Sequence, residues 1–222
     1  MSDYNTAPTK ERILAVAGDI FGEKGFKDAT IRTIAHAAQV NIAAINYHFR
    51  DKEGLYGAVL EEVFRLGFTR FPANMDLASE ASPQHRLRAF IRAMFYRLQS
   101  REGWGGIAGQ GRLIARELLD PSPAFEAVID RYIKPHRDLL LAIIGDIMGV
   151  DPGPTKLMPC VISIIGQCIY YAMASPVILK ISADNAPTED NLDRLAEFVW
   201  HFSLGGIAAI QETTPAPTKE AI

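Results

Sequence analysis

The feature that most constrains this fold is a pair of short helical segments joined by a very tight turn, between Thr30 and Phe49. Thr30 and Asn41 are good N-caps for the two segments, since both side chains can accept a hydrogen bond from an early backbone N–H. Apolar residues at helical spacing on both sides of the turn predict a small shared core: Ile31, Ile34, Ala35, Ala38, Val40 and Ile45. The pattern predicts a helix-turn-helix.

The rest of the chain also has helical periodicity, and no clear alternating strand interrupts it. A first helix is expected over 9–24 and ends at Gly25. The two short segments are the second and third helices, and a fourth begins near Asp51. A loop rich in Pro, Ala, Ser and Asn follows over 71–83, and longer helices are expected over 84–101, 106–119, 123–149, 155–174 and 188–212. Pro135 should kink or divide the third of these, because it removes a backbone donor. One more helical turn is expected over 176–181. The predicted class is therefore all-α.

The sequence predicts two domains. Residues 1–55 form a three-helix domain that contains the helix-turn-helix, and the fourth helix continues to about residue 71 as a connector. Residues 72–213 form a larger helical bundle, and 214–222 form a Pro- and Thr-rich tail that is expected to be disordered.

The charge of the chain argues against a protein that binds polyanions indiscriminately. The 222 residues carry a formal net charge of -3, and acidic residues also offset the basic ones over residues 1–52. An indiscriminate binder of polyanions would be basic. A reader of specific DNA sites, which needs only a few placed contacts, is still compatible with this charge.

The sequence indicates a cytoplasmic protein with no membrane partner. Residues 1–10 are polar and lack the pattern of a signal peptide. The longest apolar run, 161–173, is interrupted by Ser163, Gly166 and Gln167, so it is interpreted as a buried helix. Cys160 and Cys168 lie too far apart on one helix for a disulfide and are interpreted as buried, inert thiols.

The end of the second short helix carries groups that can hydrogen-bond base edges and phosphates. Asn46, Tyr47 and His48 supply an amide, a phenol and an imidazole, and Lys52 supplies an ammonium nearby. Asn pairs with adenine through two hydrogen bonds, and Lys neutralises a phosphate. These residue types point to DNA recognition.

The segment from the first helix to Leu55 resembles the TetR family of transcriptional regulators. The resemblance is carried by the run Asn41–Phe49, by Lys52–Leu55, and by several residues before them: Phe21, Gly25, Thr30, Ile31, Ile34, Ala35, Ala38 and Val40. It implies that Thr30 and Arg32 lie near the DNA backbone or groove edge. It also implies that Asn41, Ile42, Ala43 and Asn46 face the major groove, and that Tyr47, His48 and Lys52 touch phosphates or the groove wall.

The chain departs from the family pattern at two positions. Gln39 stands where most members have Gly, so it must adopt a turn conformation that costs a non-Gly residue about 1 kcal/mol. Asn46 stands where many members have Tyr, and the Tyr is shifted to position 47. Structural alternatives also stay open: His48 can pack between helices, and Lys52 can be a solvated charge at the start of the fourth helix.

The larger domain resembles the CecR-like branch of the family, on the basis of Arg116–Leu118, Asp120–Ala124, the region of Pro135, and Gly166–Cys168. This resemblance implies a small organic effector, and no cofactor is expected. An effector pocket should be mostly apolar with a few convergent polar groups. The candidates are Met94, Trp104, Arg112, Arg116, Phe125, Tyr132, Gln167, Tyr170 and Tyr171, with Phe95 and Leu98 nearby. Arg112 and Arg116 share a helix face that suits an anionic effector, but Glu117 or Asp120 can instead hold Arg116.

The last two long helices, over 155–174 and 188–212, are expected to pair two copies of the chain. Gly205 and Gly206 permit close approach, and Phe198 and Phe202 add apolar area. By resemblance to the family, a homodimer would present two recognition helices to a palindromic operator on double-stranded DNA. Effector binding would shift the dimer away from the DNA-binding form, through the fourth helix.

The two alternative functions are an enzyme and a helical adaptor. An enzyme is disfavoured because the five histidines are scattered, with none in metal-ligand spacing, and no Gly-rich phosphate loop or nucleophile elbow is present. Glu117 with His136 is the one acid–base pair that the sequence suggests. A helical adaptor that binds proteins in place of DNA is the second alternative, and the slightly acidic balance of the N-terminal region mildly favours it.

Overall fold

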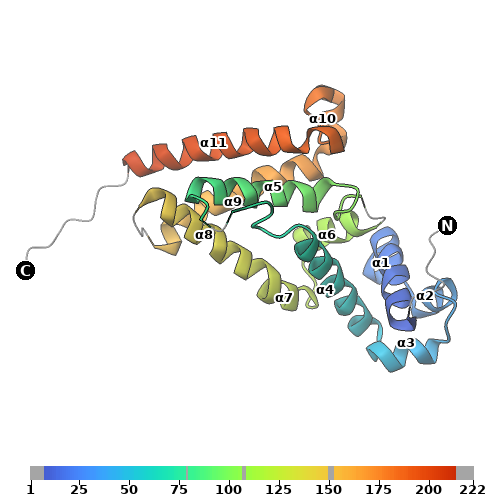
Figure 1. Cartoon of the computed structure of the whole chain (residues 1–222). Coiled ribbons are helices and arrows are strands. Elements are labelled where there is room, and N and C mark those ends of the chain that lie inside the picture. Colours follow the sequence, from blue (N-terminus) through green and yellow to red (C-terminus); the bar gives the residue numbers. More distant parts are fainter. Residues whose placement is uncertain (1–7, 79, 107–108, 150–152, 214–222) are drawn as a thin grey trace, which may run out of the picture. The chain divides into compact units, whose positions relative to one another are not determined.

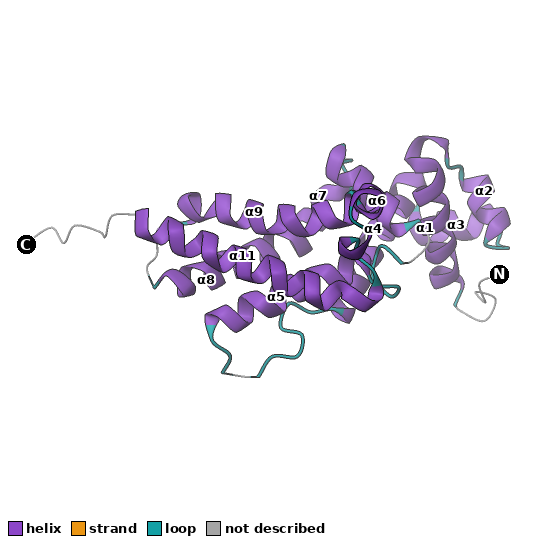
Figure 2. Ribbon diagram, turned by 90° about the horizontal axis from the view of Figure 1, so that it is seen from above, coloured by secondary structure: helices purple, strands orange, loops and turns teal. Residues whose placement is uncertain are grey.

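The computed structural model describes residues 8–78, 80–106, 109–149 and 153–213. Within these ranges every regular element is a helix and none is a strand (Figure 2). The all-α prediction is confirmed. The predicted tail over 214–222 lies outside the described residues.

The chain divides into two compact units. The first contains the residues up to Pro72 together with Tyr96–His136, and the second contains Ala73–Phe95 together with the residues from Arg137 onward. The boundary runs through one long helix, α5 (Pro83–Gln99), and near the start of another, α8 (Lys134–Met148). The domain boundaries expected from the sequence remain a prediction.

The first unit is built around four N-terminal helices (Figure 1): α1 (Thr9–Asp28), α2 (Ile31–Ala37), α3 (Ile42–Phe49) and α4 (Lys52–Arg70). It also contains α6 (Gln110–Leu119), α7 (Phe125–Val128) and the π-helical turn η2 (Ile129–Ile133). Its core joins α1 to α4 through fully buried apolar side chains, among them Ile13, Phe21, Ile34, Ile45 and Leu60. The apolar spacing read from the sequence is the origin of this core.

Gly25 kinks α1 and does not end it. Its φ of 79° lies in the left-handed region, as expected for a helix C-terminus, but the helix resumes and continues to Asp28. A β-carbon on Gly25 would also lie 2.9 Å from a guanidinium nitrogen of Arg116. The position therefore requires glycine for its backbone conformation and for the close approach of α6.

Pro135 divides the long helix predicted over 123–149. The chain forms α7, then the π-helical turn η2, and then α8, which begins one residue before the proline. A π-turn lets the backbone bypass the missing N–H of proline without ending the helix.

The second unit contains α9 (Pro154–Met173), α10 (Ser175–Ile181), the short 3-10 turns η3 (Ala183–Asn185) and η4 (Glu189–Asn191), and α11 (Leu192–Thr213). The helical turn expected over 176–181 is confirmed as α10. Cys160 and Cys168 are buried and form no disulfide, as predicted, and burial raises the pKa of the Cys160 thiol.

The interpretation of the apolar run over 161–173 as a buried helix is wrong, because α9 is buried on one side only. Val161, Ile164 and Cys168 are buried, whereas Ile162, Tyr170 and Met173 on the other side are exposed. The stretch Thr155–Met173, with mean hydropathy 1.3, is long and apolar enough to cross a membrane by length and composition alone. Of this stretch, 28% is buried. One apolar side of α9 is thus open to solvent or a partner.

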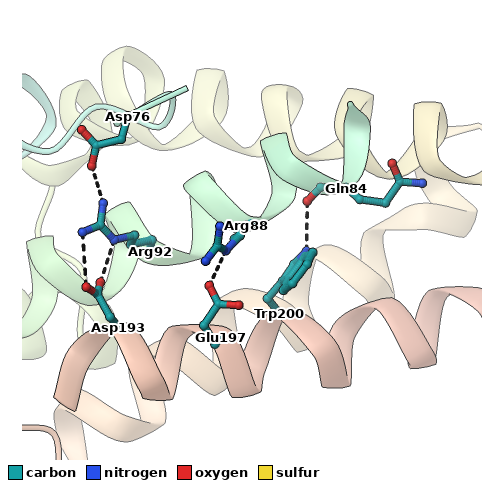
Figure 3. Close-up of polar contacts among 7 residues, drawn as sticks. All are labelled: Asp76, Gln84, Arg88, Arg92, Asp193, Glu197 and Trp200. Atoms are coloured by element: carbon teal, nitrogen blue, oxygen red, sulfur yellow. Dashed lines mark hydrogen bonds and ion pairs between the residues drawn. The ribbon is translucent and has the colours of Figure 1, made fainter. Parts of the chain in front are cut away.

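Ion pairs join α5 to α11 in the second unit (Figure 3). Arg92 donates to Asp193 at 2.6 Å and also to Asp76 in the loop before α5, and Arg88 pairs with Glu197. Such exposed pairs contribute little stability each, but as a set they fix which side of α11 faces α5. The Phe198 side of α11 is left exposed.

Candidate functional site

The turn before α3 has the geometry that the sequence requires. Gln39 has φ 53°, which confirms the expected left-handed turn residue. The Gln39 N–H donates to His36 O at 3.1 Å, and the Val40 N–H donates to Ala35 O at 3.0 Å. These bonds satisfy the backbone of the turn and offset part of the conformational cost at Gln39.

Both short helices are capped as predicted. The Thr30 hydroxyl accepts from Thr33 N at 3.1 Å, and the Asn41 Oδ1 accepts from Ala43 N at 2.9 Å. The cap occupies the side-chain oxygen of Asn41, which reduces what this residue can offer to a base edge. Arg32, on α2, is exposed.

Helix α3 buries one stripe and exposes the rest. Ile45 and Phe49 are buried against the core of the first unit. The predicted groove-facing and phosphate-contacting residues of this segment are all exposed: Asn41, Ile42, Ala43, Asn46, Tyr47 and His48. Among the described residues, Tyr47 is the most exposed of the large apolar and aromatic side chains, at 85%. The alternative that His48 packs between helices is therefore wrong.

Lys52 is held at the junction of α1 and α4. Its Nζ donates to Lys27 O at 3.2 Å and lies 4.5 Å from the centre of the Phe26 ring. The side chain is therefore not a freely solvated charge. Its ammonium group keeps further hydrogens with which to contact a phosphate.

Arg50 lies beside this surface and was not among the predicted site residues. Its side chain is 92% exposed, its φ is 71°, and its Nε donates to Asp51 at 3.1 Å. The position directly after the recognition helix was the available signal, because a cation there lies next to the surface that α3 exposes.

Helix α6 is fastened to α1 by two arginines. Arg116 donates to Phe21 O at 2.9 Å and to Glu23 O at 3.3 Å, and the Arg112 Nε donates to Gly22 O at 3.3 Å. Arg116 is thus held by backbone carbonyls instead of by Glu117 or Asp120. The geometry favours a structural role for both arginines over the anion-binding role that the sequence suggested.

Helix α6 also bonds to α4 through a buried polar pair. The Tyr56 hydroxyl donates to a Glu117 carboxylate oxygen at 2.5 Å. The other carboxylate oxygen accepts from Ser122 N at 2.9 Å and from its hydroxyl at 3.0 Å. Burial and this bond raise the pKa of Tyr56 far above its usual range, so the phenol stays protonated.

The acid–base pair suggested for an enzyme does not form. Glu117 bonds to Tyr56 and Ser122, whereas His136 Nδ1 lies 2.8 Å from Tyr132 O. Among the described residues no group of His, Cys, Asp and Glu could hold a metal ion.

An aromatic cluster in the first unit includes three of the predicted effector residues. Trp104, Phe125 and Tyr132 surround Phe64, at ring-centre distances of 4.9, 5.6 and 6.3 Å. Phe68 extends the cluster and stacks on Tyr132 at 5.7 Å. The cluster offers flat apolar walls of the kind that line small-molecule sites.

One buried and one half-buried polar residue border this cluster, and neither was among the predicted site residues. Arg97 is fully buried, donates to Phe71 O at 2.8 Å and lies 4.4 Å from the centre of the Phe68 ring. The His136 ring packs on Phe68, and burial, together with the charge of Arg97, lowers the pKa of His136. The signal for Arg97 was its place on the apolar stripe of α5, one heptad after Phe90.

The other predicted effector residues belong to the second unit. Gln167, Tyr170 and Tyr171 line a cleft of about 610 Å³ together with Phe198 and Arg194. Met94 is half-buried on α5. The nine candidates therefore fall into an aromatic cluster, a fastening helix and a separate cleft, and they do not form one site within either unit.

An apolar surface covers α9, α10 and α11 of the second unit. It contains Phe198 and Phe202, two of the predicted dimer residues, with side chains 61% and 63% exposed. Gly205 and Gly206, the other two, are exposed, and a β-carbon at either would meet nothing within 4 Å. The remaining large exposed side chains of these helices are Ile162, Tyr170, Met173, Val177, Leu179, Ile181 and Ile210.

Family models match both ends of this architecture. The model for bacterial regulatory proteins of the tetR family matches residues 13–59, and the model for the C-terminal domain of the HTH-type transcriptional dual regulator CecR matches residues 83–207. The dual regulator CecR of Shigella flexneri is 29% identical over 199 residues, which cover 86% of this chain and 87% of that protein.

Solved structures share the fold. FadR from Bacillus subtilis, in complex with stearoyl-CoA, has a TM-score of 0.65 at 17% identity and covers 88% of this chain and 98% of its own. AibR, in complex with isovaleryl coenzyme A and operator DNA, has a TM-score of 0.62 at 20% identity and covers 88% of this chain and 97% of its own. The two matching family models and the relative from Shigella flexneri are described as transcriptional regulators. The exposed, capped helix α3, the two matching family models and this shared fold show that the chain belongs to the TetR family of DNA-binding transcriptional regulators, with a C-terminal domain of the CecR type.

Proposed function

We propose that this regulator is a cytoplasmic homodimer that represses transcription from a palindromic operator and is released by a small organic effector. The observation that carries the proposal is the outer surface of α3, where Asn46 and Tyr47 are exposed on a helix fixed by the Asn41 cap and by buried Ile45 and Phe49. A surface held so firmly, with groups suited to base edges, supports DNA reading.

The apolar surface of α9–α11 supports the dimer. Monomeric proteins rarely expose contiguous apolar patches of this kind. A two-fold pairing through α11 would cover Phe198 and Phe202 of both copies, since a two-fold interface uses the same patch twice. Two recognition helices would then meet two half-sites about one helical turn apart.

The aromatic cluster of the first unit supports effector binding there. AibR and FadR were solved with acyl-CoA ligands, and we extend to this chain only the general idea of an organic effector with an apolar portion. Phe68 and Tyr132 would contact such a portion, and Arg97 lies at the edge of the cluster.

The contacts of α6 support a route from this cluster to the DNA-reading helices. Helix α6 bonds to α1 through Arg112 and Arg116 and to α4 through Glu117. A ligand that favours one position of α6 or α4 would shift the population of DNA-binding dimers. The expected route thus includes α6 as well as the fourth helix. An authentic effector that leaves operator affinity unchanged would exclude this mechanism.

The first experiment is selection of bound sequences from a random duplex library with the purified protein at about physiological salt. The expected result is a palindrome, which then serves as the probe for effectors by release. No enrichment at any salt concentration would contradict the DNA-reading proposal and favour the adaptor function.

Lys52→Ala tests the phosphate contact within the same proposal. Loss of one phosphate contact should weaken binding to all sequences and reduce the salt slope by about one ion. The matched control is Lys180→Ala on α10, which should leave the slope unchanged. An unchanged slope for Lys52→Ala would remove this residue from the interface.

A further inference from the structure

The recognition helix α3 has four stripes, each made of residues one turn apart. Ile45 and Phe49 form the buried stripe. Ala43 and Tyr47 lie opposite it and are both exposed, whereas Ile42 with Asn46 forms one flank. The side chains that reach the floor of a groove are therefore those of the Ala43 and Tyr47 stripe and of the flank that carries Asn46.

The chemistry of these side chains is unusual for a DNA reader. Between Ile42 and Phe49 the sequence contains no Arg, Lys, Asp or Glu. Arg and Lys make the commonest specific contacts to guanine, and Asp and Glu accept from cytosine. The exposed groups are a methyl, the partly exposed Ile42 side chain, a phenol and one carboxamide, together with His48 on the far flank.

The cationic side chains nearest to α3 do not supply the missing guanine contacts from α3 itself. The Lys52 ammonium is held by Lys27 O and the Phe26 ring. Arg50 comes after the last turn of α3, with its guanidinium bonded to Asp51. Arg32 is on α2. Guanine contacts from any of these would come from outside α3.

The carboxamide of Asn46 is available for two hydrogen bonds. In the part of the chain that the structure describes, no side chain or backbone group bonds to this carboxamide, and the Asn46 carbonyl oxygen accepts from Arg50 N at 2.9 Å. The Asn41 carboxamide oxygen, by contrast, is occupied by the N-cap. Adenine offers one acceptor, N7, and one donor, the N6 amino group, at the spacing that an Asn carboxamide matches.

We propose that α3 reads a run of A·T pairs at the centre of each half-site, with Asn46 bonded to one adenine and the Ala43 methyl and Tyr47 ring packed against thymine methyl groups. The inference rests on the proposed function, because it assumes that α3 enters the major groove. It adds the base composition of the operator and the atoms that are read.

The experiment compares base analogues in the operator recovered by selection. Replacing thymine with uracil removes only the 5-methyl group, and replacing adenine with 7-deazaadenine removes only the N7 acceptor. Loss of one buried methyl contact should weaken binding by about fourfold. Loss of the N7 bond should weaken binding by about fivefold or more.

Two variants assign these losses to residues. Asn46→Ala should lose sensitivity to 7-deazaadenine and relax preference at one base pair. Ala43→Gly should lose sensitivity to uracil at the thymine that Ala43 contacts and keep it at the thymine that packs against Tyr47. Ala44→Gly is its matched control, since it has the same cost in helix propensity and lies on the far flank, and it should keep the sensitivity to uracil. Circular dichroism at the assay temperature verifies that each variant is folded.

The outcomes separate this inference from the proposed function. A·T pairs whose preference disappears in Asn46→Ala, with the analogue effects above, would support it. A palindromic operator in which Asn46→Ala relaxes a G·C pair, or in which uracil has no effect at any position, would overturn the inference and leave the proposed function intact. No sequence enrichment would overturn both.

Discussion

Replacing Tyr56 with Phe tests whether the bond between α4 and α6 holds the first unit together. The hydroxyl of Tyr56 donates to Glu117 in the folded protein. The side chains of Tyr56 and Glu117 are 4% and 3% exposed, so water does not replace this bond when it is lost. Phe fills the same space, and no cavity is created. The change therefore removes one buried hydrogen bond to a carboxylate, and such a bond contributes about 1.5–3 kcal/mol.

We expect Tyr56→Phe to lower the free energy of unfolding by about 2 kcal/mol, because Ser122 still supplies two donors to the carboxylate. For a chain of this length the Tm should fall by about 4–8 °C. Guanidinium titration and calorimetry at one fixed protein concentration measure both quantities, since a dimer would make the Tm concentration-dependent.

Tyr47→Phe is the matched control, because this tyrosine is 85% exposed and its hydroxyl should contribute nothing to stability. In a double-mutant cycle with Glu117→Gln, the effect of Tyr56→Phe should fall to about 1 kcal/mol, the value of a neutral bond. If Tyr56→Phe costs no more than Tyr47→Phe, the pair does not fasten α6 to α4 and the proposed route loses its main contact.

Three further predictions concern packing, pH and assembly. Gly22→Ala should destabilise the protein by about 1–3 kcal/mol in chemical denaturation, because its β-carbon would lie 2.2 Å from Gly109 O, whereas Gly18→Ala meets only a side chain at 3.6 Å and should be tolerated. Burial lowers the pKa of His136 below 6.5 in the folded state, so the unfolded chain binds the proton first and stability should fall as pH drops below about 6.5. A His136→Gln variant with an undiminished slope would assign that pH dependence to other groups. Phe202→Asp should convert a dimer to monomer in analytical ultracentrifugation, whereas Leu119→Asp should not, although this apolar residue of α6 is even more exposed, at 75% against 63%. A Phe202→Asp protein that stays dimeric would place the interface elsewhere.

The amino-acid sequence by itself determined the helical class and the DNA-reading motif, because both depend on local physics. Apolar spacing fixes which side of a short helix is buried, and Thr30 and Asn41 cap their helices through bonds that span only two or three residues. The turn conformation of Gln39 was expected from the resemblance to the TetR family, most of whose members have Gly at this position.

The contacts that organise the effector region were decided by tertiary structure. Arg116 bonds to carbonyls 93 and 95 residues away in the chain, and no local spacing shows that α6 packs on the C-terminal part of α1. From the sequence, the expected partner of Arg116 was an acidic neighbour or an anionic effector. The structure shows neither contact. Likewise, Arg97 was not among the residues singled out from the sequence, and its burial depends on how α5 packs against Phe68 and Phe71. Side-chain identity limits what a residue can bond to, but only the fold brings a distant partner within reach.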